Sequence, residues 1–201
     1  MIEVGPADEN DMVFAFLRAE VDSPRFGPAY SPHFGRLRAA GITRERLIDN
    51  ADLNSPRDNT QRIELLKAVR GYRANALLFT SFPDDAMWRT VGIERADWTR
   101  VRYANHVPWV RLSGGTRIVA DGAANIDSIV VADANENIRA LVTELGKGKR
   151  CPDLIGVDDG CNGIILVEGH CRATAYALTR LQENVRCLVG SSTHMKDWVF
   201  Y

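Results

Sequence analysis

The residues best suited to chemistry stand next to one another in this chain, at Glu168, Gly169, His170, Cys171 and Arg172. The apolar residues 164–167 precede them and predict a strand, and the residues after them predict a helix whose apolar face includes Thr174, Ala177, Leu178 and Leu181. A strand that runs directly into a helix leaves free backbone N–H groups and the positive end of the helix dipole at the junction. The junction is therefore predicted to bind an anion, and phosphate is the natural ligand.

The side chains at this junction suggest a division of roles. Gly169 allows the backbone or a ligand to approach closely, and the Arg172 guanidinium can hold a phosphate through two hydrogen bonds. Glu168 and His170 are groups that can transfer protons. Glu168, His170 and Arg172 are therefore the candidate catalytic residues. We expect Arg172→Ala to lower ligand affinity and to leave the fold intact, because the residue stands at a helix start, outside the apolar face.

Two of these residues have alternative interpretations. Glu168 can act as a base or hold a magnesium ion, or it can accept backbone hydrogen bonds or pair with Arg172. Cys171 lies at a predicted helix start beside His170 and Arg172, which favours a reactive thiolate with a lowered pKa. The other interpretation of Cys171 is a packed, unreactive thiol.

Residues 168–176, Glu-Gly-His-Cys-Arg-Ala-Thr-Ala-Tyr, resemble the G-x-x-R motif of the ParB/sulfiredoxin-like superfamily. In that superfamily a strand, this turn and a helix hold the phosphates of a nucleotide. The resemblance extends over about residues 107–190, where a helix (137–145), a strand (154–157) and a turn (158–163) precede the motif strand. It implies an α+β fold with a small mixed β-sheet, and a phosphate cradle made by Gly169, His170, Cys171 and Arg172.

The superfamily includes ATP-dependent sulfiredoxins, CTP-binding DNA-partitioning proteins, nucleotide-dependent free serine kinases and proposed nucleases. In sulfiredoxins the reactive cysteine directly follows the motif glycine, where this chain has His170, and Cys171 comes one position later. The pattern of an acidic residue, Gly, His, any residue and Arg is closer to the kinase-like members. The resemblance therefore implies an enzyme that uses ATP or a related nucleotide, with Mg²⁺, as a kinase-type transferase or as a hydrolase, with a small-molecule acceptor.

Two further segments are candidates for contact with the nucleotide. Residues 107–112 and 117–120 predict the strands of a hairpin, and its turn region supplies Ser113, Thr116 and Arg117. Hydroxyls and a guanidinium beside glycines suit a second phosphate, although a plain hairpin turn has the same composition. Asn135 stands near the start of the 137–145 helix, for which Asp133 and Glu136 predict a capping box. In the superfamily arrangement that helix start faces the nucleotide.

The rest of the chain predicts a helical region, 1–105, followed by the nucleotide-binding domain, 106–201. Helices are predicted over residues 9–21, from residue 43, after Ser55-Pro56 to about residue 70, and over 84–91 and 94–103. Besides the segments already described, residues 126–131 and 185–190 predict strands. The apolar tail, which contains Trp198, Phe200 and Tyr201, is expected to dock on the body or on a partner chain.

Composition limits the alternatives. The 201 residues carry 25 Lys and Arg against 26 Asp and Glu, a formal net charge of -1, which disfavours nonspecific coating of nucleic acid. A nucleotide-gated DNA- or partner-binding protein of the ParB type remains the second hypothesis, and a thiol redox enzyme acting through Cys171 the third. The absence of an apolar run of about 18 residues, and of a signal-like start, predicts a cytoplasmic protein with no membrane partner. A homo-oligomer is compatible with the sequence.

Overall fold

Six strands form one mixed sheet through the middle of the molecule, in the order β1-β2-β6-β4-β5-β3. The computed structural model describes residues 1–179 and 184–201. The strands are β1 (Ile2–Pro6), β2 (Met87–Ile93), β3 (Val101–Arg102), β4 (Leu154–Asp158), β5 (Ile164–Glu168) and β6 (Val185–Ser191). β6 pairs with β4 in parallel and with β2 antiparallel, and β5 pairs antiparallel with β4 and parallel with β3. The α+β class expected from the sequence is confirmed.

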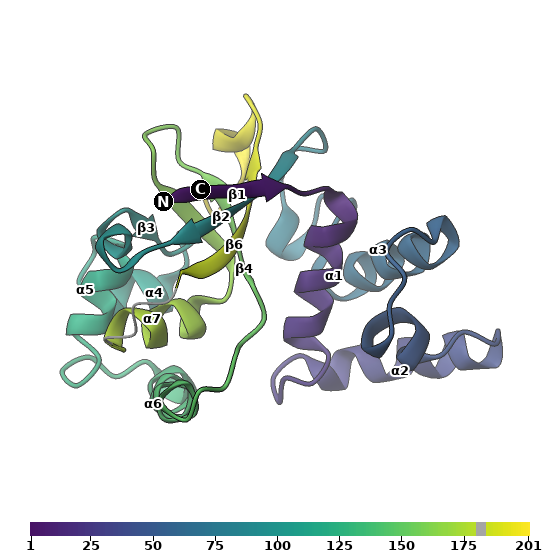
Figure 1. Ribbon diagram of the computed structural model, residues 1–201, viewed down its shortest axis with the longest axis horizontal. Coiled ribbons are helices and arrows are strands. Elements are labelled where there is room, and N and C mark those ends of the chain that lie inside the picture. Colours follow the sequence, from purple (N-terminus) through teal and green to yellow (C-terminus); the bar gives the residue numbers. More distant parts are fainter. Residues whose placement is uncertain (180–183) are drawn as a thin grey trace.

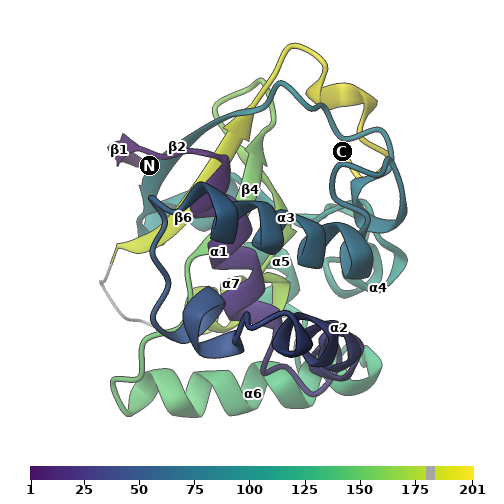
Figure 2. The same ribbon diagram turned by 90° about the vertical axis from the view of Figure 1, so that its right-hand side faces the viewer.

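Helices cover both faces of this sheet (Figure 1). The α-helices are α1 (Glu9–Glu20), α2 (Gly27–Ala39), α3 (Pro56–Arg70), α4 (Val107–Leu112), α5 (Val119–Ala124), α6 (Ala132–Gly146) and α7 (His170–Leu178). A π-helix, η1 (Glu45–Asp49), and the 3-10 helices η2 (Leu77–Phe79), η3 (Arg95–Thr99) and η4 (Met195–Asp197) complete the set. α1 to α3 lie on one side of the sheet and α4 to α7 on the other, with α6 at the edge of the molecule (Figure 1 and Figure 2).

The strand before the motif is buried on both faces, which explains its unbroken apolar sequence. Ile165 and Val167 pack in the core shared with α1 and α3, while Ile164 and Leu166 pack in the core on the opposite face. Strands that are covered on both faces have continuous apolar sequences, whereas strands covered on one face alternate apolar and polar residues. The predicted strands at 154–157, 164–167 and 185–190 are confirmed as β4, β5 and β6.

The first helices begin and end where their capping residues indicate. Asp8 forms a capping box with Asp11 at the start of α1, and the Ser55 hydroxyl accepts a hydrogen bond from the Asp58 N–H at the start of α3. α3 ends at Gly71, whose φ of +80° lies in the left-handed region. The predicted helices at 9–21, 43–48 and 56–70 are therefore confirmed, the second of them as η1.

The predicted helix at 84–91 is wrong. β2 occupies this segment and pairs with β6 along its whole length, from Met87 opposite Ser191 to Ile93 opposite Val185. Trp88 packs on one face of the sheet and Val91 on the other, so a central position in the sheet outweighs the local helical pattern. Of the predicted 94–103 helix, only the 3-10 turn η3 forms.

The predicted hairpin at 107–120 is also wrong, because this segment forms α4 and α5. Pro108 lies in the first turn of α4, where the N–H that it lacks has no helical partner anyway. Residues 126–131 form a turn followed by an irregular segment instead of a strand. The Asn135 amide satisfies their backbone by donating to the carbonyls of Ile126 (2.7 Å) and Ile129 (2.9 Å).

α6 confirms the predicted 137–145 helix but starts earlier, at Ala132, without the predicted capping box. Its start is instead held by Asn135, whose Oδ1 accepts a hydrogen bond from the Val131 N–H at 2.8 Å. α7 confirms the helix after the motif, and Thr174 is fully buried on it. Leu181, predicted for the same apolar face, lies outside the described residues.

The boundary predicted between residues 105 and 106 does not separate two structural units. β1, β2 and β3 precede it and β4, β5 and β6 follow it, within one sheet. The C-terminal tail docks on the body, as expected: Trp198 is 2% exposed and donates from Nε1 to the Leu78 carbonyl at 2.7 Å. Within the described residues no helix has the length and apolar character to cross a membrane.

Candidate functional site

The motif forms the predicted junction between β5 and α7. Gly169 follows β5 with a φ of +97°, and a Cβ atom there would lie 2.5 Å from Leu154 Cδ2 and 3.1 Å from an Arg172 guanidinium nitrogen. The first helical hydrogen bond of α7 runs from the Ala173 N–H to the Gly169 carbonyl at 2.8 Å. The backbone N–H groups of His170, Cys171 and Arg172 have no hydrogen-bond acceptor within the part of the chain that the structure describes. Three donors are therefore left for a ligand at the positive end of α7.

Arg172 supports this turn from the inside. It is 8% exposed, forms an ion pair with Glu168 and donates to the Pro152 carbonyl at 3.0 Å. Burial lowers the pKa of its guanidinium. The contacts tie the end of β5 to the loop before β4, so Arg172 is a positioning residue. The expectation that Arg172 could be removed without affecting the fold does not agree with this burial, and pairing with Arg172 is the interpretation of Glu168 that the geometry bears out.

His170 lies against two aromatic rings at the start of α7. Its imidazole stacks on Trp109 and Tyr103, with ring centroids 5.0 and 5.9 Å away, and its Nε2 accepts a hydrogen bond from the Ala104 N–H at 3.3 Å. Burial lowers the pKa of His170 to about 3. The ring is therefore neutral at pH 7 with its proton on Nδ1, which makes it a hydrogen-bond donor to a ligand and a poor base.

This lowered pKa predicts a specific loss of stability in acid. An unfolded histidine titrates near pH 6.5, so between pH 6.5 and 3 the unfolded chain binds a proton that the folded chain excludes. The free energy of unfolding should therefore fall by about 2 kcal/mol between pH 7 and pH 5 because of His170 alone. Urea unfolding of the protein and of His170→Gln at both pH values measures this contribution. An identical pH dependence in the two proteins would contradict the neutral, buried imidazole.

Basic side chains from separate elements surround the start of α7. Coulombic interactions with His106, Arg70, Arg25 and Arg117 act with burial to lower the pKa of His170. Arg70 ends α3, Arg25 stands between α1 and α2, and His106 precedes α4. These residues come from distant parts of the sequence. Arg70 is itself paired with the buried Glu20 carboxylate at 3.4 Å, which compensates its charge.

Cys171 does not have the lowered pKa predicted for it. Burial raises the pKa of its thiol to about 11, and the one positive charge that opposes this shift is Arg25. At neutral pH the group is a protonated thiol, and the packed interpretation of Cys171 agrees with the structure. The geometry therefore gives no support to redox chemistry at this cysteine.

The secondary candidates have structural partners. The buried Ser113 hydroxyl donates to the Trp109 carbonyl at 2.9 Å and accepts from the Arg117 N–H at 2.8 Å. Thr116 donates to Asp121 at 2.6 Å, and Asn135 serves the loop before α6 as described above. The hydrogen bonds given above for these three side chains all go to residues outside the motif, 168–172. The hairpin on which the prediction for Ser113 and Thr116 rested is absent.

Arg117 is the exception among the secondary candidates, because its charge reaches His170. Its guanidinium donates to the main-chain oxygens of Tyr103 (2.9 Å), Tyr201 (2.8 Å) and Phe200 (3.3 Å). It therefore fixes the C-terminal tail beside Tyr103, which directly follows β3. Arg117 therefore lies within electrostatic range of the junction, but its guanidinium donates to the main chain of Tyr103 and of the C-terminal tail.

Sequence reasoning missed the partners that make the junction basic and aromatic. Arg25, Arg70, Tyr103, His106 and Trp109 carried no local signal, because each gains its role only by packing near α7. His106 in particular has the sequence setting of an ordinary surface histidine. The one available hint was the excess of Arg over Lys, with only four lysines in the chain.

The predicted magnesium site does not fit the residues present. Among residues 1–179 and 184–201 no group of three or more His, Cys, Asp or Glu side chains is placed to hold a metal ion. Glu168, the predicted ligand, is engaged by Arg172. Comparisons of the chain with protein-family models, curated proteins and solved structures find no match. The site must therefore be interpreted from its own chemistry.

Proposed function

We propose that this protein binds ATP or a related nucleotide through its phosphates at the start of α7, and uses it for phosphoryl transfer to, or hydrolysis with, a small-molecule acceptor. The observation that carries the proposal is the set of three unpaired backbone N–H groups at residues 170–172, within electrostatic range of Arg25. Such donors stabilise the negative charge of phosphate oxygens and need no rearrangement to do so.

The residues of the site contribute in different ways. The N–H groups of residues 170–172 and the Nδ1–H of His170 donate to phosphate oxygens, while Arg25 supplies positive charge. Arg172 acts through the turn, because its ion pair with Glu168 keeps the donors in place. With Glu168 held in that pair and His170 a weak base, we assign the proton of the acceptor to no residue of this chain.

The resemblance to the ParB/sulfiredoxin-like superfamily supports a nucleotide over a simple anion as the ligand. Its motif requires a strand, a turn at the glycine and a helix, and β5, Gly169 and α7 follow in that order. A nucleotide substrate also requires a compartment in which nucleotides are abundant. We therefore propose that the protein acts in the cytoplasm.

Thermal denaturation with added nucleotides tests the proposal, since a ligand that binds the native state raises its melting temperature. We expect ATP or a related nucleotide to raise it, and ribose 5-phosphate to have a smaller effect. Arg25→Glu places a negative charge near His170 and Cys171, so it should weaken nucleotide affinity at least tenfold, which is about 1.4 kcal/mol.

The matched control for this variant is Arg18→Glu, which makes the same charge change at an exposed position on α1. It should leave the affinity within about twofold of the unaltered protein. ATP, ADP, CTP and GTP are compared with and without Mg²⁺. The absence of any nucleotide effect, or equal affinities for the two variants, would contradict phosphate binding at this site.

A further inference from the structure

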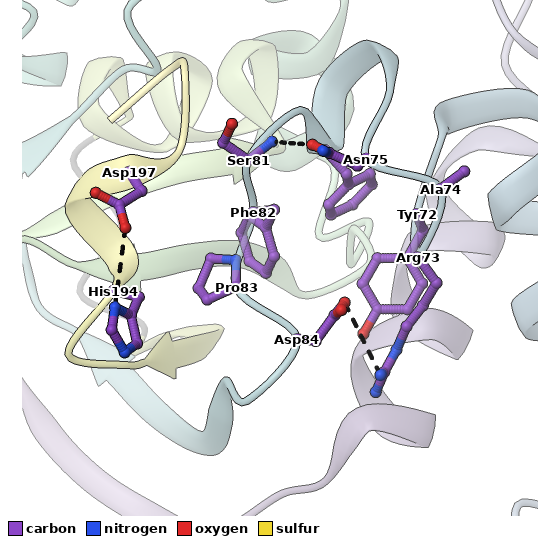
Figure 3. Close-up of a pocket in the computed structure, with 11 residues that line it drawn as sticks. Tyr72, Arg73, Ala74, Asn75, Ser81, Phe82, Pro83, Asp84, His194 and Asp197 are labelled. Carbon is purple, nitrogen blue, oxygen red and sulfur yellow. Dashed lines mark hydrogen bonds and ion pairs between the residues drawn. The ribbon is translucent and has the colours of Figure 1, made fainter.

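A second site candidate is a hollow of about 610 Å³ on the side of the sheet that carries α3. It lies between the loop that follows α3 and the segment around η4 (Figure 3). Its volume falls within the range of small-molecule pockets. Figure 3 shows His194 and Asp197 on one side of the hollow and Tyr72 and Arg73 on the other, with Phe82 and Pro83 between them. None of the residues at the start of α7 lines it.

The loop that builds this hollow has an unusual backbone. Arg73, Asn75, Leu77 and Ser81 all have left-handed φ values, between 48° and 58°, although none is a glycine. Each such residue is disfavoured by about 1 kcal/mol or more, and it persists only when its surroundings fix it. Backbone strain of this kind concentrates at ligand-binding sites.

Specific hydrogen bonds fix the strained loop. The Ser81 N–H donates to Asn75 Oδ1 at 2.6 Å, and the Val199 N–H donates to the Thr80 carbonyl at 3.3 Å. The Trp198 indole N–H, already described, donates a hydrogen bond to the Leu78 carbonyl. The hollow is therefore held in shape from both of its sides before a ligand arrives, which reduces the entropy lost on binding.

Phe82 and Pro83 supply most of its apolar surface, because Phe79 and Tyr72, which also line it, are only 1% and 6% exposed. Phe79 lies edge-on to Tyr72 with ring centroids 4.8 Å apart, and edge-on to Phe82 at 5.2 Å. Aromatic faces attract both apolar groups and cations. A ligand with an apolar body fits these rings.

The charged side chains around the hollow determine whether it binds a cationic or an anionic group. Arg73 is already bound to Glu9 at 2.8 Å, and Asp84 lies 3.9 Å from the same guanidinium. Asp197 faces His194 at 3.8 Å, and the side chains of Asp84 and Asp197 are 76% and 71% exposed. The guanidinium that lines the hollow is thus paired with Glu9, which lies outside it, and two carboxylates, Asp84 and Asp197, line the hollow itself. The hollow attracts a cation and disfavours an anion.

We propose that this hollow binds an organic ammonium group carried on an aromatic or aliphatic body. The ammonium lies at the Asp197 carboxylate, Asp84 adds negative charge to the hollow, and the apolar body lies on Phe82. A free amine and the lysine side chain of a partner protein share this chemistry. The proposal is independent of nucleotide binding at α7.

Titration with 2-phenylethylamine, followed by amide chemical shifts at pH 8, tests this proposal. We expect shifts at residues 72–84 and 194–197, and at least tenfold weaker binding of the neutral 2-phenylethanol and the anionic phenylacetate. The variant Asp84→Asn/Asp197→Asn should weaken amine binding at least tenfold and remain folded, since both side chains are exposed. Asp133→Asn/Glu136→Gln on α6 removes the same charge at exposed positions and should leave binding unchanged.

The two sources of the ammonium group are distinguished with N-acetyl-lysine amide. Binding of this compound more tightly than 2-phenylethylamine assigns the hollow to a lysine of a partner, and the reverse order assigns it to a free amine. Equal binding of amine, alcohol and carboxylate would overturn the proposal. So would an amine affinity that is the same in Asp84→Asn/Asp197→Asn and in the control variant.

Discussion

Arg172→Ala is expected to lower the free energy of unfolding by about 3 kcal/mol. The variant leaves the Glu168 carboxylate without its partner at a position where that side chain is only 19% exposed, and it also leaves the Pro152 carbonyl without its donor. For a chain of this length the loss corresponds to a melting temperature lowered by roughly 6–12 °C. Urea unfolding and thermal denaturation without ligand measure both values.

Two further variants separate the ion pair from side-chain volume. Arg186→Ala removes a 57% exposed guanidinium that pairs with Asp153, and it should cost less than about 0.5 kcal/mol. Arg172→Met/Glu168→Leu replaces both charges with apolar groups and should recover most of the lost stability. If Arg172→Ala were as stable as Arg186→Ala, the guanidinium would be free for a ligand and the positioning role would be wrong.

Gly71→Ala should destabilise the protein by about 3 kcal/mol and should also weaken the amine site. Gly71 ends α3 with a φ of +80°, and a Cβ atom there would overlap the Ala76 carbonyl group. The clash is with backbone, so it can be relieved only by moving the strained loop that lines the hollow. Urea unfolding measures the stability, and titration with 2-phenylethylamine measures the second effect.

Gly41→Ala is the control for this prediction. Gly41 has a similar φ of +74°, but no atom lies within 4 Å of a Cβ placed there. It should therefore lose only about 1 kcal/mol, the cost of a left-handed alanine. Equal losses in the two variants would mean that the contact with Ala76 contributes nothing.

The sequence contained enough information to predict the junction between β5 and α7, because its determinants are local. An apolar run, a glycine and a helix-forming segment follow one another within residues 164–178, and each forms the expected element. Local patterns also sufficed for α1, whose apolar residues have helical spacing, and for α3, whose ends are marked by Ser55 and Gly71.

Segments whose conformation depends on distant pairing could not be predicted in this way. The 87–93 segment is a strand because β1 and β6 lie on either side of it, and β6 is about a hundred residues away in the chain. Residues 107–112 and 119–124 form helices although Val107, Trp109 and Val110 suit a strand. The contact of this segment with the sheet is an isolated bridge from Ile118 to Arg102 of the edge strand β3.

The same distinction applies to the site. Gly169 and the free N–H groups of α7 follow from a local pattern, whereas the burial of Arg172 depends on the loop at Pro152. The basic groups around His170 come from α3, from the loop between α1 and α2, and from the start of α4. No spacing along the chain brings Arg25 and Arg70 near a helix that begins a hundred or more residues later.

The most direct test of phosphate binding is the response of the amide groups of His170, Cys171 and Arg172 to ATP and to inorganic pyrophosphate. In ¹H–¹⁵N spectra, we expect the amide protons of these three residues to show the largest shifts, because new hydrogen bonds to phosphate oxygens form at them. Pyrophosphate should reproduce the pattern with lower affinity. If all three amide signals stayed unchanged while nucleotide bound elsewhere, or if no nucleotide bound, the central claim would be wrong.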